Sequence, residues 1–227
     1  MKLTIITPTT GRQSLFNSIT SINTQNFDSY EHILLWDDKR EDDFLRKGSN
    51  PYLFNIDKNE TSRYSIVIPG CSINGDATGS SLRSIGLMAA KGDYVTFMDD
   101  DIMWENNHIS TMMEAIKDKN WAFCKRKIWS KIAEGEYEYL GVDNFESIGE
   151  DAKVPYKMVD NSSMMFKRRF GTSAAPLYRE TKEYNDDRLM YNFLKTYAGE
   201  AGKTNLATIN QICPDKLIEF FSKNCTK

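Results

Sequence analysis

Short apolar runs alternate with helical patterns along the first half of the chain, and this alternation constrains the fold more than any other feature. The first run, Leu3 to Thr7, ends at Pro8, and the apolar residues 15, 19 and 22 then fall on one helical face. The same kind of run recurs at residues 32–36, 64–68 and 94–98. Short buried strands that alternate with amphipathic helices are typical of a sheet covered by helices. We therefore expect an α/β fold with a central, mostly parallel sheet flanked by helices.

The remaining apolar patterns predict further elements. Helical spacing of apolar residues favours helices at residues 80–90, 109–116, 187–197 and 217–221. Apolar runs predict strands at residues 121–129 and 163–166. We expect the charged segment 39–62 to be a loop, whereas residues 130–160 show no pattern that favours one class.

Composition limits the class of protein. The 227 residues are enough for one domain with a buried core, and the net charge of −3 argues against nucleic acid as the main partner. Two distant histidines make a histidine-rich zinc site unexpected. Four cysteines without a C-x-x-C pair are typical of free thiols in a reducing compartment, so we expect a cytoplasmic protein. We find no signal peptide and no apolar run of about 18 residues, so we expect no transmembrane segment, and peripheral membrane contact stays open.

The strongest chemical signal is Asp99-Asp100-Asp101, which directly follows the apolar run 94–98. Three adjacent carboxylates repel one another, so they favour a site that holds a cation. Open α/β sheets bind ligands at the carboxyl ends of their strands, and oxygen ligands of this kind suit Mn²⁺ or Mg²⁺ shared with phosphate. The alternative is a solvated acidic turn in which Asp101 caps the next helix.

Two weaker signals also follow predicted strands. The segment from Thr7 to Arg12 offers hydroxyls, backbone amides and a guanidinium to a diphosphate, although it lacks the P-loop and dinucleotide-binding glycine patterns. Asp37-Asp38 closes the second strand, where carboxylates accept hydrogen bonds from ribose hydroxyls or base N–H groups. Each signal is equally typical of an ordinary turn.

Helices carry the other candidates. Arg83 lies within a predicted helix and is a natural partner for a diphosphate, although a surface arginine is the simpler reading. Asp186-Asp187 opens a helix, where either acid could serve as general base or merely favour the helix dipole. Three aromatic residues could stack on sugars, but we expect them to pack in the core: Trp104, Trp129 and Tyr178.

Four blocks, taken in order, resemble the family-two inverting glycosyltransferases of the GT-A fold with a D-x-D element. They are ITPTTGRQSLFNSITSINTQNFDSYEHILLWDD (Ile6 to Asp38), LRSIGLMAAKGDYVTFMDDDIMW (Leu82 to Trp104), DNSSMMFKRRF (Asp160 to Phe170) and YNDDRLMYNFL (Tyr184 to Leu194). The similarity spans roughly residues 2–195, and its specificity comes from the order of the blocks, because each block alone is weak.

The resemblance implies one glycosyltransferase domain over residues 1–227, with a nucleotide-sugar-binding half at 1–104 and an acceptor-side half at 105–227. It implies inverting, metal-dependent transfer from a nucleotide-diphospho-sugar, with a UDP-sugar favoured, to a hydroxyl of a glycan or a lipid-linked sugar. The residues implied to bind the donor are Thr7, Pro8, Thr9, Arg12, Asp37, Asp38, Arg83, Asp99 and Asp100.

For the chemistry itself, the resemblance implies that Asp101 ligates Mn²⁺ or Mg²⁺ and that Asp99 reaches the ribose or the metal shell. Asp187 would be the general base, with Asp186 as its substitute, because Asp186 stands where the family usually has glutamate. A sugar nucleotidyltransferase is the alternative enzyme, although residues 7–12 lack the extra glycines of a triphosphate loop. A nucleotide-sugar-binding module that has lost catalysis is the third reading.

Overall fold

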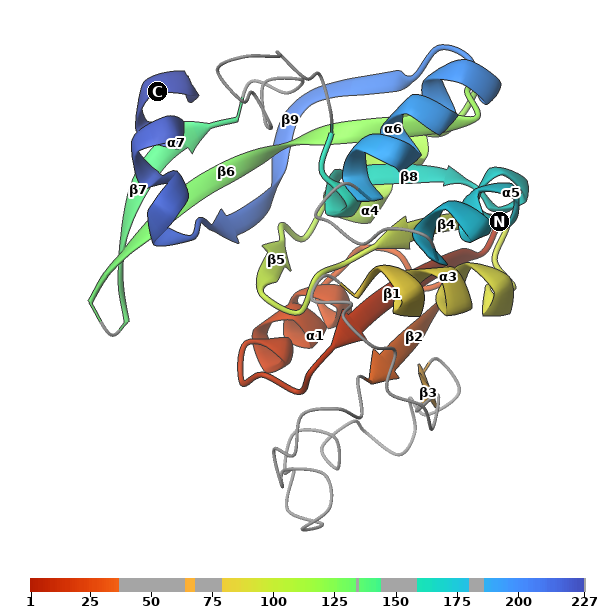
Figure 1. The fold of residues 1–227 in the computed structure, drawn as a ribbon, viewed down its shortest axis with the longest axis horizontal. Coiled ribbons are helices and arrows are strands. Elements are labelled where there is room, and N and C mark those ends of the chain that lie inside the picture. Colours follow the sequence, from red (N-terminus) through yellow and green to blue (C-terminus); the bar gives the residue numbers. More distant parts are fainter. Residues whose placement is uncertain (37–63, 68–78, 134, 144–158, 180–185, 227) are drawn as a thin grey trace, which may run out of the picture.

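The computed structural model describes residues 1–36, 64–67, 79–133, 135–143, 159–179 and 186–226. Its helices and strands are shown in Figure 1. The strands are β1 (Leu3–Thr9), β2 (Tyr30–Trp36), β3 (Tyr64–Val67), β4 (Tyr94–Phe97), β5 (Ile102–Trp104), β6 (Trp121–Ala133), β7 (Glu136–Val142), β8 (Met164–Lys167) and β9 (Gly202–Ile212). The helices are α1 (Leu15–Asn23), α3 (Ser80–Ala89), α4 (His108–Ile116), α5 (Arg168–Arg179), α6 (Asp186–Tyr197) and α7 (Ile218–Asn224), with 3-10 turns η2 (Asn161–Ser163) and η3 (Asp215–Leu217).

The strands form one sheet of the order β3-β2-β1-β4-β8-β6-β9-β5, with β7 paired to β6 outside this path. The first four strands are parallel, as the alternating pattern predicts. Beyond β4 the sheet is mixed: β8 is antiparallel to both β4 and β6, β6 runs parallel to β9, and β5 is antiparallel to β9. The α/β expectation of a sheet flanked by helices is confirmed, and the sheet is mixed because β5, β7 and β8 join it by antiparallel pairing.

Helices cover both faces of the parallel strands. All seven residues of β1 are buried, as expected of a strand covered on both faces. Because side chains alternate along a strand, Ile6 packs in one cluster with residues of α3, α5 and α6. Its neighbour Ile5 packs in another cluster with residues of α1 and α4. This packing fixes the strand ends that carry the candidate site.

Four elements were not predicted from the sequence: β5, β7, β9 and α5. Most of β7 is exposed and β9 is partly exposed, and neither segment contains an apolar run; pairing with β6, and for β9 also with β5, makes them strands. Helix α5 contains Gly171 and Pro176, which both disfavour a helix. Gly171 is needed because a Cβ there would come within 2.7 Å of the Phe166 ring and 2.9 Å of Leu87. Tertiary contacts thus override local propensity in these elements.

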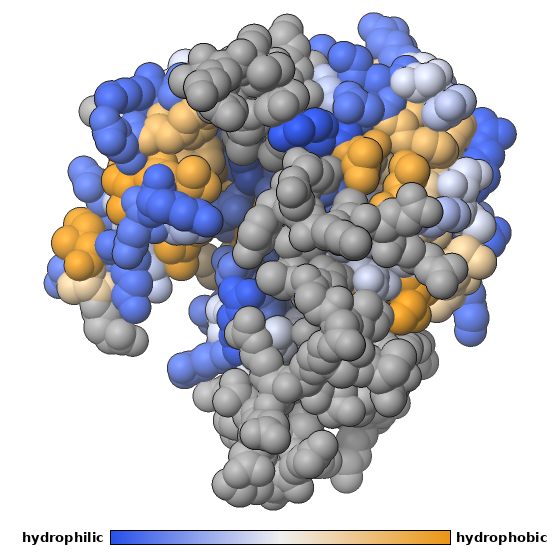
Figure 2. All heavy atoms as spheres, in the orientation of Figure 1, coloured by the Kyte–Doolittle hydropathy of each residue, from blue (hydrophilic) through white to orange (hydrophobic). Residues whose placement is uncertain are grey.

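The C-terminal helix α7 packs on the β6–β7 hairpin. Phe221, Ile128 and Leu140 form a small core there, and Leu217 and Ile218 are only partly buried against it. Apolar surface is visible at this end of the molecule, at the left of Figure 2. None of the described helices is long and apolar enough to cross a lipid bilayer.

Candidate active site

The carboxyl ends of β1 and β4 bring two of the predicted segments together. Because the two strands are parallel neighbours, they end at the same edge of the sheet. The Thr9 hydroxyl, at the end of β1, donates to Asp100 Oδ2 at 2.7 Å. Arg12 Nη1 lies 3.0 Å from Asp101 Oδ2, and Arg12 Nε lies 3.7 Å from Asp100 Oδ1. The side chains of Thr9 and Arg12 therefore lie against the acidic triplet.

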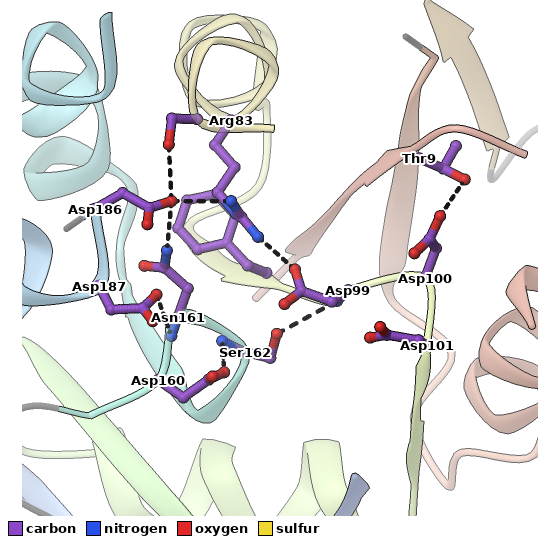
Figure 3. Close-up of polar contacts among 12 residues, drawn as sticks. Thr9, Arg83, Asp99, Asp100, Asp101, Asp160, Asn161, Ser162, Asp186 and Asp187 are labelled. Carbon is purple, nitrogen blue, oxygen red and sulfur yellow. Dashed lines mark hydrogen bonds and ion pairs between the residues drawn. The ribbon is translucent and has the colours of Figure 1, made fainter. Parts of the chain in front are cut away.

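The three aspartates of the triplet have different surroundings. Figure 3 shows Asp101 pointing toward Asp99, whereas Asp100 turns the other way, toward Thr9. Burial raises the pKa of Asp100, and the Thr9 hydrogen bond partly opposes this. Partial burial and the negative charges of Asp99 and Asp100 raise the pKa of Asp101 to about 6. Among the described residues, Arg12 and Arg83 are the cations that pair with the triplet, and Arg83 also pairs with Asp186, so the three carboxylates exceed these cations in charge.

The carboxylate oxygens of Asp99 and Asp101 fit a divalent cation that a substrate also holds. Asp101 and Asp99 offer hard oxygen ligands in surroundings of excess negative charge, which suits Mn²⁺ or Mg²⁺. The described residues contain no group of three or more His, Cys, Asp or Glu side chains that could hold an ion by themselves. Phosphate oxygens and water would therefore have to complete the coordination.

Arg83 links the triplet to the acidic pair of α6. Its side chain is buried in α3, with Nη2 bound to Asp99 Oδ1 and Nη1 2.9 Å from Asp186 Oδ2. Asp99 and Asp186 are far apart in the sequence, so this arginine bridges two distant segments (Figure 3). Sequence reasoning selected Arg83 as a donor contact, and the structure adds these two carboxylate contacts.

The two acids of α6 are not equivalent. Asp186 is 6% exposed, and its Oδ2 accepts hydrogen bonds from the Ser80 hydroxyl at 3.0 Å, Arg83 Nη1 at 2.9 Å and Asn161 Nδ2 at 3.2 Å. Asp187 accepts one hydrogen bond from a described residue, the Asn161 backbone N–H at 3.0 Å. Burial, followed by the negative charges of Asp160 and Asp186, raises the pKa of Asp187 well above its usual range. Asp187 is therefore the carboxylate more available to a ligand.

The turn η2 is a part of the site that the sequence analysis quoted but did not select. Asp160 caps this turn, its Oδ1 accepting the Ser162 N–H at 2.9 Å. Ser162 Oγ accepts the Asp99 N–H at 3.3 Å, and the Tyr178 hydroxyl donates to Asn161 Oδ1 at 2.7 Å. The polar run Asp-Asn-Ser-Ser directly before an apolar strand is the signal that could have identified it.

A second buried arginine, Arg126 of β6, lies behind this turn. It is 2% exposed, and its Nη1 lies 2.9 Å from Asp160 Oδ2. Its Nε and Nη2 donate to Asp143 Oδ2 at 3.1 and 2.6 Å. Burial disfavours the charged guanidinium, but Asp160 and Asp143 outweigh it and the pKa of Arg126 is raised. No sequence signal distinguishes Arg126 from the lysines beside it.

The remaining residues that the sequence analysis selected as candidates lie in different surroundings. Asp37 and Asp38 lie outside the described residues. Thr7 and Pro8 are buried, and the Thr7 hydroxyl is 2.9 Å from His32 Nε2. Of the aromatic candidates, Trp104 is buried and stacks on His108, Tyr178 is buried beside Phe97, and Trp129 Nε1 donates to Asn210. Core packing is confirmed for Trp104 and Tyr178.

Comparison with known proteins agrees with this architecture. Residues 77–171 match the sequence model of glycosyl transferase family 2, and this segment contains Arg83, Asp99–Asp101 and the η2 turn. Among curated proteins, none matches the chain significantly.

Several solved structures have a similar fold. A crystal structure of S. aureus TarS 1–349 superposes with a TM-score of 0.65 at 14% identity, covering 100% of this chain and 67% of that one. The same protein in complex with UDP-GlcNAc gives a TM-score of 0.64 at 14% identity and covers 95% of this chain and 59% of that one. A longer TarS structure gives 0.63 at 14% identity, covering 94% of this chain, which spans only 37% of that chain's length. The chain therefore has the GT-A glycosyltransferase fold, and residues 77–171 carry the sequence pattern of glycosyl transferase family 2.

Proposed function

We propose that this chain transfers a sugar from a nucleotide-diphospho-sugar, with a UDP-sugar favoured, to a hydroxyl of a glycan or lipid-linked sugar. The observation that carries the proposal is the Asp99–Arg83–Asp186 bridge, which holds the acidic triplet and the acidic pair of α6 in one site. The family-2 segment, the GT-A fold and the UDP-GlcNAc complex of TarS support it. Residues 1–104 would then bind the donor, and residues 105–227 would face the acceptor.

The donor side would use the β1 and β4 strand ends. Asp101, with Asp99 beside it, would hold Mn²⁺ or Mg²⁺, and Arg12 would face the diphosphate. When bound, the ion would neutralise the charge that develops on the leaving diphosphate. Thr9 and Arg83 would maintain the triplet through their contacts with Asp100 and Asp99.

Asp187 would act as the general base. Asp186 already accepts three hydrogen bonds, so its role would be to anchor the start of α6. Asp187 would take the proton from the acceptor hydroxyl as that oxygen attacks the anomeric carbon. The bond from the anomeric carbon to the diphosphate oxygen breaks in the same step, on the opposite face, so the configuration inverts.

The test compares three variants with UDP-GlcNAc as the first donor, with and without Mn²⁺. Asp101→Ala should abolish metal-dependent release of UDP, and Asp187→Asn should retain donor binding by calorimetry while turnover is lost. Asp118→Asn, which removes an exposed carboxylate in the turn after α4, should behave as wild type.

The products separate the competing functions. Pyrophosphate formed from a nucleoside triphosphate and a sugar phosphate would indicate a nucleotidyltransferase. Donor binding by the wild-type protein without any release of UDP would indicate a binding module. Full activity in both Asp101→Ala and Asp187→Asn would refute the assignment of the site.

A further inference from the structure

Two carboxylates from different parts of the chain are held on consecutive amides of the same turn. Asp160 Oδ1 accepts the N–H of Ser162 at 2.9 Å, and Asp187 Oδ1 accepts the N–H of Asn161 at 3.0 Å. Figure 3 shows both side chains beside η2. Because neighbouring amides of one turn hold them, the two carboxylates keep a fixed relation to each other.

The partners of the two carboxylates differ. Asp160 Oδ2 is bound by Arg126 Nη1 at 2.9 Å, and Asp143 holds the opposite edge of the same guanidinium. Asp187 has no hydrogen bond to an arginine or lysine within the described parts of the chain. Arg126 therefore stabilises the ionised form of Asp160, whereas Asp187 has no hydrogen-bonded cation among the described residues.

This asymmetry determines where a proton binds. Burial and then the charge of Asp160 are the largest causes that raise the pKa of Asp187. Burial also raises the pKa of Asp160, but the charge of Arg126 opposes it most strongly. The pair therefore takes up its first proton on Asp187. Among the described residues, the charged and titratable groups that act on or near Asp187 are Asp99, Asp160, Asp186, Arg83, Arg126 and Tyr178.

We propose that Asp160, fixed by Arg126, is a positioning residue that orients Asp187 and sets how readily it accepts the proton of the acceptor hydroxyl. This inference rests on the proposed function, in which Asp187 is the base. The turn η2 places the two carboxylates side by side, and the Arg126–Asp143 pair keeps the charge of Asp160 in place behind the base.

Asp160→Asn separates this role from a structural one. Asparagine caps a helical turn about as well as aspartate, so the hydrogen bond to the Ser162 N–H is expected to survive. The substitution removes the negative charge beside Asp187. A residue that only caps η2 would tolerate the change, whereas a residue that sets the basicity of Asp187 would not.

The primary measurement is a ¹³C NMR titration of the Asp187 carboxyl group in the full chain without substrate, assigned by comparison with Asp187→Asn. Asp160→Asn should lower the pKa of Asp187 by about one unit or more, because a like charge is lost. In the pH profile of UDP-GlcNAc hydrolysis, the fall in rate on the acid side should move to lower pH in Asp160→Asn. The plateau kcat should fall by about three- to tenfold with the donor KM unchanged, because a weaker base accepts the proton less readily. Asp160→Glu, which keeps the negative charge, should recover part of the kcat that Asp160→Asn loses.

Asp143→Asn is the matched control, since it removes the other carboxylate of Arg126 without touching η2. The pKa of Asp187 should shift clearly less in Asp143→Asn than in Asp160→Asn. An unchanged titration in Asp160→Asn, or equal shifts in both variants, would overturn the inference. Because the titration needs no turnover, an inactive wild-type protein would refute the proposed function, while the titration would still decide whether Asp160 sets the proton affinity of Asp187.

Discussion

Arg83→Met tests whether the buried arginine bridge holds the site together. Methionine keeps much of the length of the side chain in α3 and removes the guanidinium that pairs with Asp99 and Asp186. Arg83 is 5% exposed, so its loss leaves negative charge in a region that water reaches poorly. Removing one partner of a buried ion pair costs about 3–5 kcal/mol.

The hydrogen bonds and solvation that Asp186 and Asp99 keep in Arg83→Met place the expected loss of stability at the lower end of this range. After the substitution, Asp186 keeps the Ser80 hydroxyl and the Asn161 amide as hydrogen-bond donors. The Asp99 side chain is 30% exposed, so water can solvate part of its charge. We therefore expect Arg83→Met to lower the free energy of unfolding by about 3 kcal/mol.

Urea unfolding followed by the fluorescence of the buried Trp104 and Trp121 measures this change. Asp186→Asn in the Arg83→Met background should recover stability, with a coupling energy of about 1–2 kcal/mol between the two sites. Arg168→Met removes an exposed arginine at the start of α5 and should stay within about 0.5 kcal/mol of wild type. A loss below about 1 kcal/mol in Arg83→Met, or no coupling with Asp186, would refute the reasoning.

Further predictions concern packing and pH. Gly86→Ala should lower the free energy of unfolding by about 1–3 kcal/mol, because the added Cβ would lie 2.5 Å from Ile6 Cγ2 and 2.8 Å from Leu35 Cδ1. Urea titration measures this change. An unchanged unfolding midpoint would contradict this packing of α3 on the sheet. Burial lowers the pKa of both His32 and His108 from 6.5 to about 3, so the unfolded state binds more protons between these values. Stability should be independent of these groups above pH 6.5 and fall by about 1.4 kcal/mol per pH unit for each histidine as the pH drops below it. His108→Gln should remove half of that slope in chemical unfolding at several pH values, and an unaltered slope would show that His108 is not buried in its neutral form.

The predicted parts of the fold and of the site share a local origin. The strands β1, β2 and β4 are buried almost completely, so their sequences are mostly apolar and stand out without any knowledge of their partners. The Asp99–Asp101 triplet was identifiable for a related reason, because adjacent carboxylates after a buried strand have an electrostatic cost that a ligand can offset.

The unpredicted parts depend on contacts between distant segments. β9 is partly exposed and rich in polar residues, and it is a strand because β6 and β5 bind its two edges. Arg126 and Asp143 resemble ordinary surface residues in the sequence, yet they form a buried pair behind η2. Charge in a linear sequence does not reveal whether water or another charge will be its neighbour.

The sequence by itself determined the parallel half of the sheet, the helices over it and the acidic segments at its edge, because hydrophobic periodicity and strand-end carboxylates are local properties. Only the tertiary structure decided the surroundings of each carboxylate. Asp186 and Asp187 are neighbours in sequence, but Arg83, Ser80 and Asn161 converge on the first and leave the second beside Asp160. The reason is that solvation and ion pairing depend on how the chain packs around each group, and segments 25 to 106 residues away supply that packing.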